Sequence, residues 1–102
     1  MICYFNMNKK TKIYKVWQLE KASSVLESIC YAIATASNIE EKTTMSAIAF
    51  DQTKVVASFI AEKNGLGFDE VDRIYCALYK DLMEHPLKAD QIIEEVIEMN
   101  AS

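Results

Sequence analysis

The chain has 102 residues, of which 51% are hydrophobic and 25% are charged, and its formal net charge is −4. Its length fits one domain rather than two, and its apolar content is too high for a disordered chain. With two glycines and one proline, the sequence favours long helices, because β-rich domains need many turns. The acidic balance argues against nucleic-acid binding over the whole surface, because both surfaces would be negative.

The three cysteines, Cys3, Cys30 and Cys76, match neither a disulfide framework nor a zinc site. Their number is odd, and the sequence contains no CxxC or CxxH pair. No signal-peptide pattern is recognised at residues 1–7, and no uncharged stretch is long enough to cross a membrane. Together with reduced thiols, these features predict a cytoplasmic protein.

The first 17 residues differ from the rest and predict a separate basic and aromatic arm. Their charged residues are four lysines, namely Lys9, Lys10, Lys12 and Lys15. β-branched and aromatic residues flank residues 6–11, which predicts an extended arm or a short β-hairpin. When the helical pattern of the next segment is extended backwards, Ile13 and Trp17 fall off its apolar stripe. We therefore expect a structural break near residue 17.

Four amphipathic segments follow, and apolar residues recur in each of them every three or four positions. They predict helices over residues 18–37, 39–64, 69–84 and 89–100. Asn38 followed by Glu41 is typical of a capping box, and Gly65 suits a helix end because glycine adopts the left-handed conformation readily. Pro86 ends the third helix, since the residue before a proline leaves the helical region. The predicted fold is all-α: a compact four-helix bundle in residues 18–102, with the arm in residues 1–17.

The helix expected over residues 39–64 carries two apolar faces, which predicts a protein interface. The second face is rich in alanine, and one layer of neighbouring helices would leave it uncovered. Gln52 lies within the main apolar stripe, where one polar residue can set the register or the oligomeric state. The predicted interface consists of Ala47, Phe50, Gln52, Ala57 and Ala61. We expect this interface to form a homodimer. The alternative is that helices of the same chain cover both faces.

Residues with catalytic or metal-binding chemistry are few. His85 is the only histidine, and Asp81 and Glu84 precede it closely enough to share a site, but a histidine also suits the negative end of a helix. The Gly65–Gly67 turn precedes a helix, yet the acids in that helix would repel phosphate. We therefore predict no enzyme, no cofactor and no metal. A small enzyme or metal-binding protein using Asp81 and His85 is kept as the second alternative.

The first alternative is a nucleic-acid-associated regulator, because lysines alternate with aromatic residues in the arm. Lysines contact phosphates, and aromatic rings stack on bases. The residues that would make these contacts are Lys9, Lys10, Lys12, Tyr14, Lys15 and Trp17.

The favoured function is a non-enzymatic protein–protein interaction module that binds a partner protein or itself. Small acidic helical proteins often act as inhibitors, immunity proteins, antitoxins or chaperones, and this comparison is one of size and class only. Residues 83–86 are similar to a fragment of the colicin-nuclease immunity proteins. The tyrosine pair of that family has no counterpart at residues 90–93, so the sequence assigns no family.

Overall fold

The computed structural model of the protein describes the backbone of residues 2–101 and the side chains of residues 18–101. Over this part of the chain it is all-α and contains no strand. Its elements are α1 (Ile2–Ala34), α2 (Ile39–Lys63), α3 (Phe68–Glu84), the 3-10 helix η1 (Pro86–Lys88) and α4 (Ala89–Met99). The prediction of an all-α four-helix bundle is confirmed.

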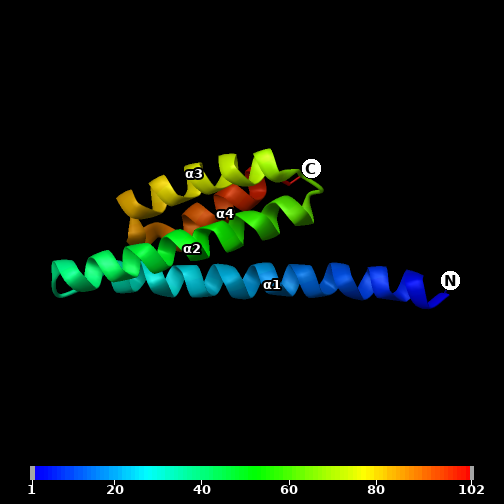
Figure 1. Cartoon of the computed structure of the whole chain (residues 1–102), viewed down its shortest axis with the longest axis horizontal. Helices are drawn as coiled ribbons and strands as arrows, with labels where there is room; N and C mark the ends of the chain where they lie inside the picture. The colour runs from blue at the N-terminus through cyan, green and yellow to red at the C-terminus, as the bar shows by residue number, and fades with distance from the viewer. Residues whose placement is uncertain (1, 102) are drawn as a thin grey trace.

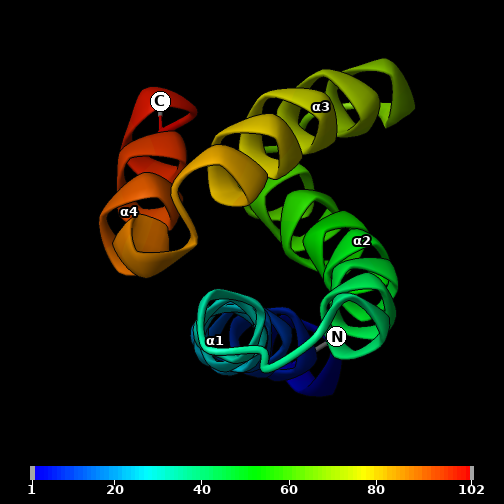
Figure 2. The ribbon, with the colours of Figure 1, turned by 90° about the vertical axis from the view of Figure 1, so that its left-hand side faces the viewer.

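The four helices surround one core (Figures 1 and 2). α1 and α2 lie side by side, α2 packs against α3, and α4 lies between α3 and α1. Seen along the bundle, α2 and α4 therefore occupy opposite corners (Figure 2). None of the helices in the described part of the chain combines the length and the apolarity that crossing a bilayer would require.

The core is built from the predicted apolar stripes of all four helices. Its largest fully buried apolar side chains are Leu26, Val56, Ile60, Ile74, Leu78 and Leu82. α4 adds Ile93 and Val96. Burial of such side chains is the main favourable term in folding, at about 1.5–3 kcal/mol for each. Thr53 is also fully buried, and its hydroxyl donates to the Ala49 carbonyl at 2.6 Å, so this polar group keeps a hydrogen bond.

α1 differs from the prediction, because it begins at Ile2 and runs without interruption to Ala34. The expected break near residue 17 and the expected extended arm or β-hairpin are therefore wrong. No glycine or proline precedes Gly65 in the sequence, so an established helix can extend by one hydrogen bond per residue. β-branched and aromatic residues lower helix propensity by only about 0.7 kcal/mol or less each. The division into residues 1–17 and 18–102 as two units stays a prediction.

The two ends of α2 follow the local signals in the sequence. The Asn38 side chain accepts a hydrogen bond from the Glu41 backbone N–H at 2.8 Å, which confirms the N-cap. The Glu41 carboxylate reaches back one residue further than expected and accepts from the Ser37 backbone N–H at 3.0 Å. After α2, Gly65 has a φ of 67°, which is the left-handed conformation predicted for it.

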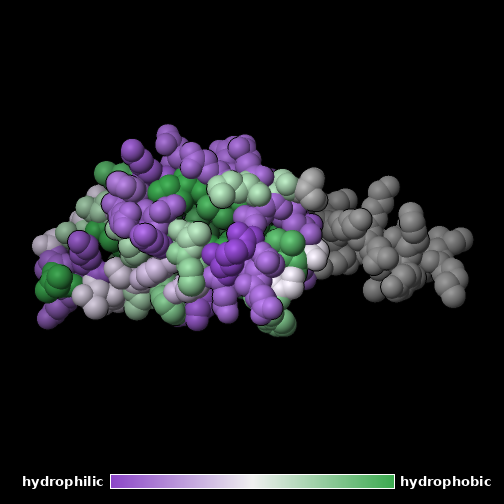
Figure 3. Space-filling view, turned by 90° about the horizontal axis from the view of Figure 1, so that it is seen from above, coloured by the Kyte–Doolittle hydropathy of each residue, from purple (hydrophilic) through white to green (hydrophobic). Residues whose placement is uncertain are grey.

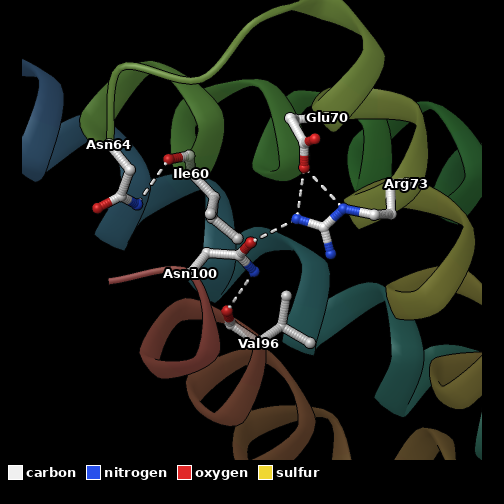
Figure 4. A network of polar contacts seen from close by, with 6 residues as sticks. All are labelled: Ile60, Asn64, Glu70, Arg73, Val96 and Asn100. Carbon is white, nitrogen blue, oxygen red and sulfur yellow. Dashed lines mark hydrogen bonds and ion pairs between the residues drawn. The ribbon is translucent and has the colours of Figure 1, made fainter. Parts of the chain in front are cut away.

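A polar network joins the beginning of α3 to the end of α4 (Figure 4). Arg73 pairs with Glu70 on α3, with Nη2 and Oε2 2.6 Å apart. The same Nη2 donates to Asn100 Oδ1 at 3.0 Å, and Asn100 Nδ2 donates to the Val96 carbonyl at 2.8 Å. Arg73 therefore ties α4, the shortest of the four α-helices, to α3. Because the ion pair is partly exposed, its own contribution to stability is small.

Candidate functional site

Only some of the interface residues predicted on α2 are exposed in the structure. Ala57 and Ala61 are 0% and 1% exposed, so the expectation that they lie on an uncovered face is wrong. α2 packs against both α1 and α3, which is the alternative of a helix covered on two sides within one chain. Small side chains allow the helix backbones to approach closely. Ala57 and Ala61 therefore belong to the core, and a partner could not contact them in this fold.

Phe50 lies at the surface but already has aromatic neighbours. Its ring is 38% exposed and packs edge to face against Tyr75 and Tyr79 of α3, with centroid distances of 5.2 and 5.5 Å. The Lys54 ammonium lies 4.5 Å from the centroid of the Phe50 ring. Ala47 is exposed. The use of Phe50 and Ala47 in a homodimer stays a prediction.

Gln52 connects two helices within the chain. It is half-buried, and its Nε2 donates to the Ala22 carbonyl of α1 at 3.0 Å. A polar group at a packed position needs such a partner, and here the bond fixes the position of α2 relative to α1.

A groove between α1 and α4 has no counterpart among the predicted sites. It has a volume of about 510 Å³, and we call it the acidic groove. Four of its carboxylates come from two helices: Glu20, Glu27, Asp90 and Glu94. Its apolar lining consists of Ile97, which is half-buried, and of Leu19 and Ile93, which belong to the core and are only 3% and 2% exposed. Lys63 also lines the groove. No local pattern in the sequence predicts the groove, because the acids of α1 and those of α4 lie about 70 residues apart along the chain.

Burial and charge repulsion act together on the Glu27 carboxyl in the acidic groove. Burial raises the pKa of the Glu27 carboxyl above its usual value, and the negative charges of Asp90 and Glu94 raise it further. Charged carboxylates therefore disfavour one another here, and a cation between them would relieve that repulsion. Ser23 lines the same groove, and its buried hydroxyl has no hydrogen-bond partner.

The acidic groove continues towards exposed apolar side chains at one end. Glu27 and Asp90 also line a smaller hollow of about 190 Å³, together with Tyr31 and Leu87. Tyr31 is 63% exposed and Leu87 is 70% exposed. Together the two hollows combine negative charge with apolar contact area. On the face seen from the side of α3, hydrophilic residues surround scattered apolar areas (Figure 3).

Another hollow, of about 610 Å³, lies at the turn between α1 and α2. Its lining includes Asn38 and Glu41, whose polar atoms form the cap of α2. Glu41, one of the acids of this hollow, therefore already serves the helix end, which makes the hollow a weaker candidate than the acidic groove.

The predicted catalytic and metal candidates do not gather into a cluster. His85 and Asp81 are both exposed, and the bond between them joins the His85 backbone N–H to the Asp81 carbonyl at 2.9 Å. Over the residues that the structure describes, no three side chains of histidine, cysteine, aspartate or glutamate are placed to hold one metal ion.

The side chains proposed to contact nucleic acid lie outside the described residues. These are Lys9, Lys10, Lys12, Tyr14, Lys15 and Trp17. The nucleic-acid alternative therefore stays a prediction.

Cys30 and Cys76 should differ strongly in reactivity. Cys30 is fully buried, and burial, followed by the nearby Glu27 charge, raises the pKa of its thiol to about 11. Cys76 is exposed. Because the thiolate is the reactive form, iodoacetamide at pH 8 should modify Cys76 quickly and Cys30 only after denaturant is added. Mass spectrometry of the two peptides measures both rates, and equal rates in the native protein would contradict the burial of Cys30.

Comparison of the chain with models of known protein families, with curated proteins and with solved structures returned no match.

Proposed function

We propose that this chain is a non-catalytic binding module that recognises a protein through the acidic groove. One observation carries the proposal: one groove brings together the carboxylates of Glu20, Glu27, Asp90 and Glu94, and the half-buried side chain of Ile97 lines it as well. Its extension adds the exposed side chains of Tyr31 and Leu87. A surface of this composition fits a basic and partly apolar segment of a protein.

Each part of the surface has a distinct physical role in such binding. Carboxylates attract a basic partner and set its register, while apolar contact supplies affinity when water is released. Aromatic residues are enriched at protein interfaces, because one end of a tyrosine is apolar and the other can remain wet. Phosphate-bearing ligands would be repelled by the same carboxylates, which favours a protein over a nucleotide or nucleic acid in this groove.

A non-enzymatic binding module is also the functional class expected from the sequence. The proposed binding surface is different, because it is the acidic groove and not the predicted face of α2. A cytoplasmic inhibitor, immunity protein, antitoxin or chaperone would use such a groove to hold its partner without turnover. Phe50 and Ala47 remain a secondary surface for self-association.

The test compares three forms of the tagged, full-length protein in capture from the native host extract. The groove variant carries Glu20→Gln, Glu27→Gln and Glu94→Gln. The control variant carries Asp72→Asn, Asp81→Asn and Glu84→Gln, which remove the same charge from exposed positions on α3. α3 contributes no residue to the groove lining.

The wild type and the control should retain the same protein, and the groove variant should retain at least about tenfold less of it, since each lost charge pair weakens binding. Equal retention by all three forms, or no protein retained by any, would refute the proposed function.

A further inference from the structure

We propose that the acidic groove receives residues 9–15 of a second copy of this chain, so that two copies form a reciprocal dimer. The inference rests on the proposed function, because it names the occupant of the same groove.

Charge complementarity points to this occupant. Among the residues whose side chains the structure describes, the groove lining holds four carboxylates against one cation, Lys63. Residues 1–17 hold four lysines and no acid, whereas the basic residues of the remaining chain are outnumbered by acids. The N-terminal segment is therefore the strongest basic complement that the sequence contains. Opposite charges in such an arrangement attract the two surfaces and fix their register.

The dimensions of the two surfaces also agree. Residues 9–15 belong to α1, whose backbone is helical from Ile2, so they span about 9 Å at the helical rise of 1.5 Å per residue. Glu20 and Glu27, on the groove wall, are separated by about 10 Å on the same scale. One basic segment therefore matches the length of one acidic wall.

A second copy is required because the segment cannot lie along the groove of its own chain. Residues 9–15 and the acids Glu20 and Glu27 lie on one uninterrupted helix, α1. A continuous helix cannot fold back to lie beside itself. An antiparallel second copy can place its own residues 9–15 beside this wall, and a twofold axis then fills both grooves and closes the assembly.

The apolar pattern of the segment supports the same arrangement. The segment is not only basic, because Ile13 lies among its lysines. The half-buried Ile97 offers apolar surface in the groove. An occupant with both lysines and apolar residues matches a groove with both carboxylates and apolar side chains.

The experiment uses charge reversal in the full-length protein. The segment variant carries Lys9→Glu, Lys12→Glu and Lys15→Glu. The groove variant carries Glu20→Lys, Glu27→Lys and Glu94→Lys. A control carries Asp72→Lys, Asp81→Lys and Glu84→Lys, at exposed positions on α3. Sedimentation equilibrium at low salt and about 50 μM protein measures association, and circular dichroism checks that each variant is helical.

The wild type and the control should be dimeric, and each reversed variant alone should dissociate at least about tenfold more readily, because like charges then meet. An equal mixture of the two reversed variants should form dimers, since each segment then faces a groove of opposite charge. High salt should weaken the wild-type dimer. Dimer formation in the mixture would also show that both variants are folded.

Three results would overturn the inference: a monomeric wild type, a dimer that neither reversal affects, or a mixture that fails to associate. If the wild type is monomeric but still captures another protein through the groove, a second copy is not the occupant. The proposed function would then still be supported. If a reversed variant loses its helical signal, substitution by glutamine at the same positions gives the decisive comparison, and an unchanged dimer there also refutes the inference.

Discussion

Ala57→Glu is expected to destabilise the protein by about 3–5 kcal/mol, because it places an unpaired carboxylate inside the core. Ala57 is 0% exposed on α2, and α2 is covered there by α1 and α3. Since a domain of this size has a total stability of about 5–15 kcal/mol, much of the folded population is expected to be lost. Urea denaturation followed by circular dichroism measures the change.

Ala47→Glu is the matched control for this substitution. Ala47 belongs to the same predicted face of α2, but its side chain is exposed. Glutamate is nearly as good a helix former as alanine, so the cost should be less than about 1 kcal/mol. Equal losses at both positions would show that the whole face is buried. A negligible loss at Ala57 would show that the face is open in solution.

Leu78→Ala is expected to cost about 2–5 kcal/mol, because it removes a large side chain and leaves a cavity. Leu78 is fully buried in the middle of α3. The midpoint of urea unfolding should fall while the slope of the transition stays the same, which is the signature of a lost core contact.

Leu87→Ala provides the control for the leucine substitution, because Leu87 is 70% exposed. Its effect should stay within about 0.5 kcal/mol. A loss at Leu87 comparable to that at Leu78 would mean that the hollow formed with Tyr31 is occupied in solution, and would contradict the exposure of Leu87.

The helices were largely predictable because their signals are local. α2 begins at Ile39 after the Asn38 cap and ends at Lys63, close to the predicted end. α3 and α4 also begin and end within one residue of their predicted limits. Capping groups, a left-handed glycine and a proline act on their immediate neighbours, so they can be recognised without knowing the fold.

α1 shows where the same reasoning fails. Ile13 and Trp17 do not continue the apolar stripe predicted for residues 18–37, which is why a break near residue 17 was expected. Periodicity reports which side of a helix is covered, whereas the backbone bonds depend only on neighbouring residues. A helix therefore needs no continuous apolar stripe, and α1 runs from Ile2 to Ala34 without interruption.

The sequence by itself determined the fold class, most helix limits and the separation of basic from acidic segments, because each depends on residue types and short spacings. Only the tertiary structure decided which surfaces remain available. It buried Ala57 and Ala61 between helices, and it brought Glu27 of α1 together with Asp90 and Glu94 of α4 in one groove. Burial and long-range proximity depend on how helices pack, and helical periodicity contains no information about which neighbour covers a face.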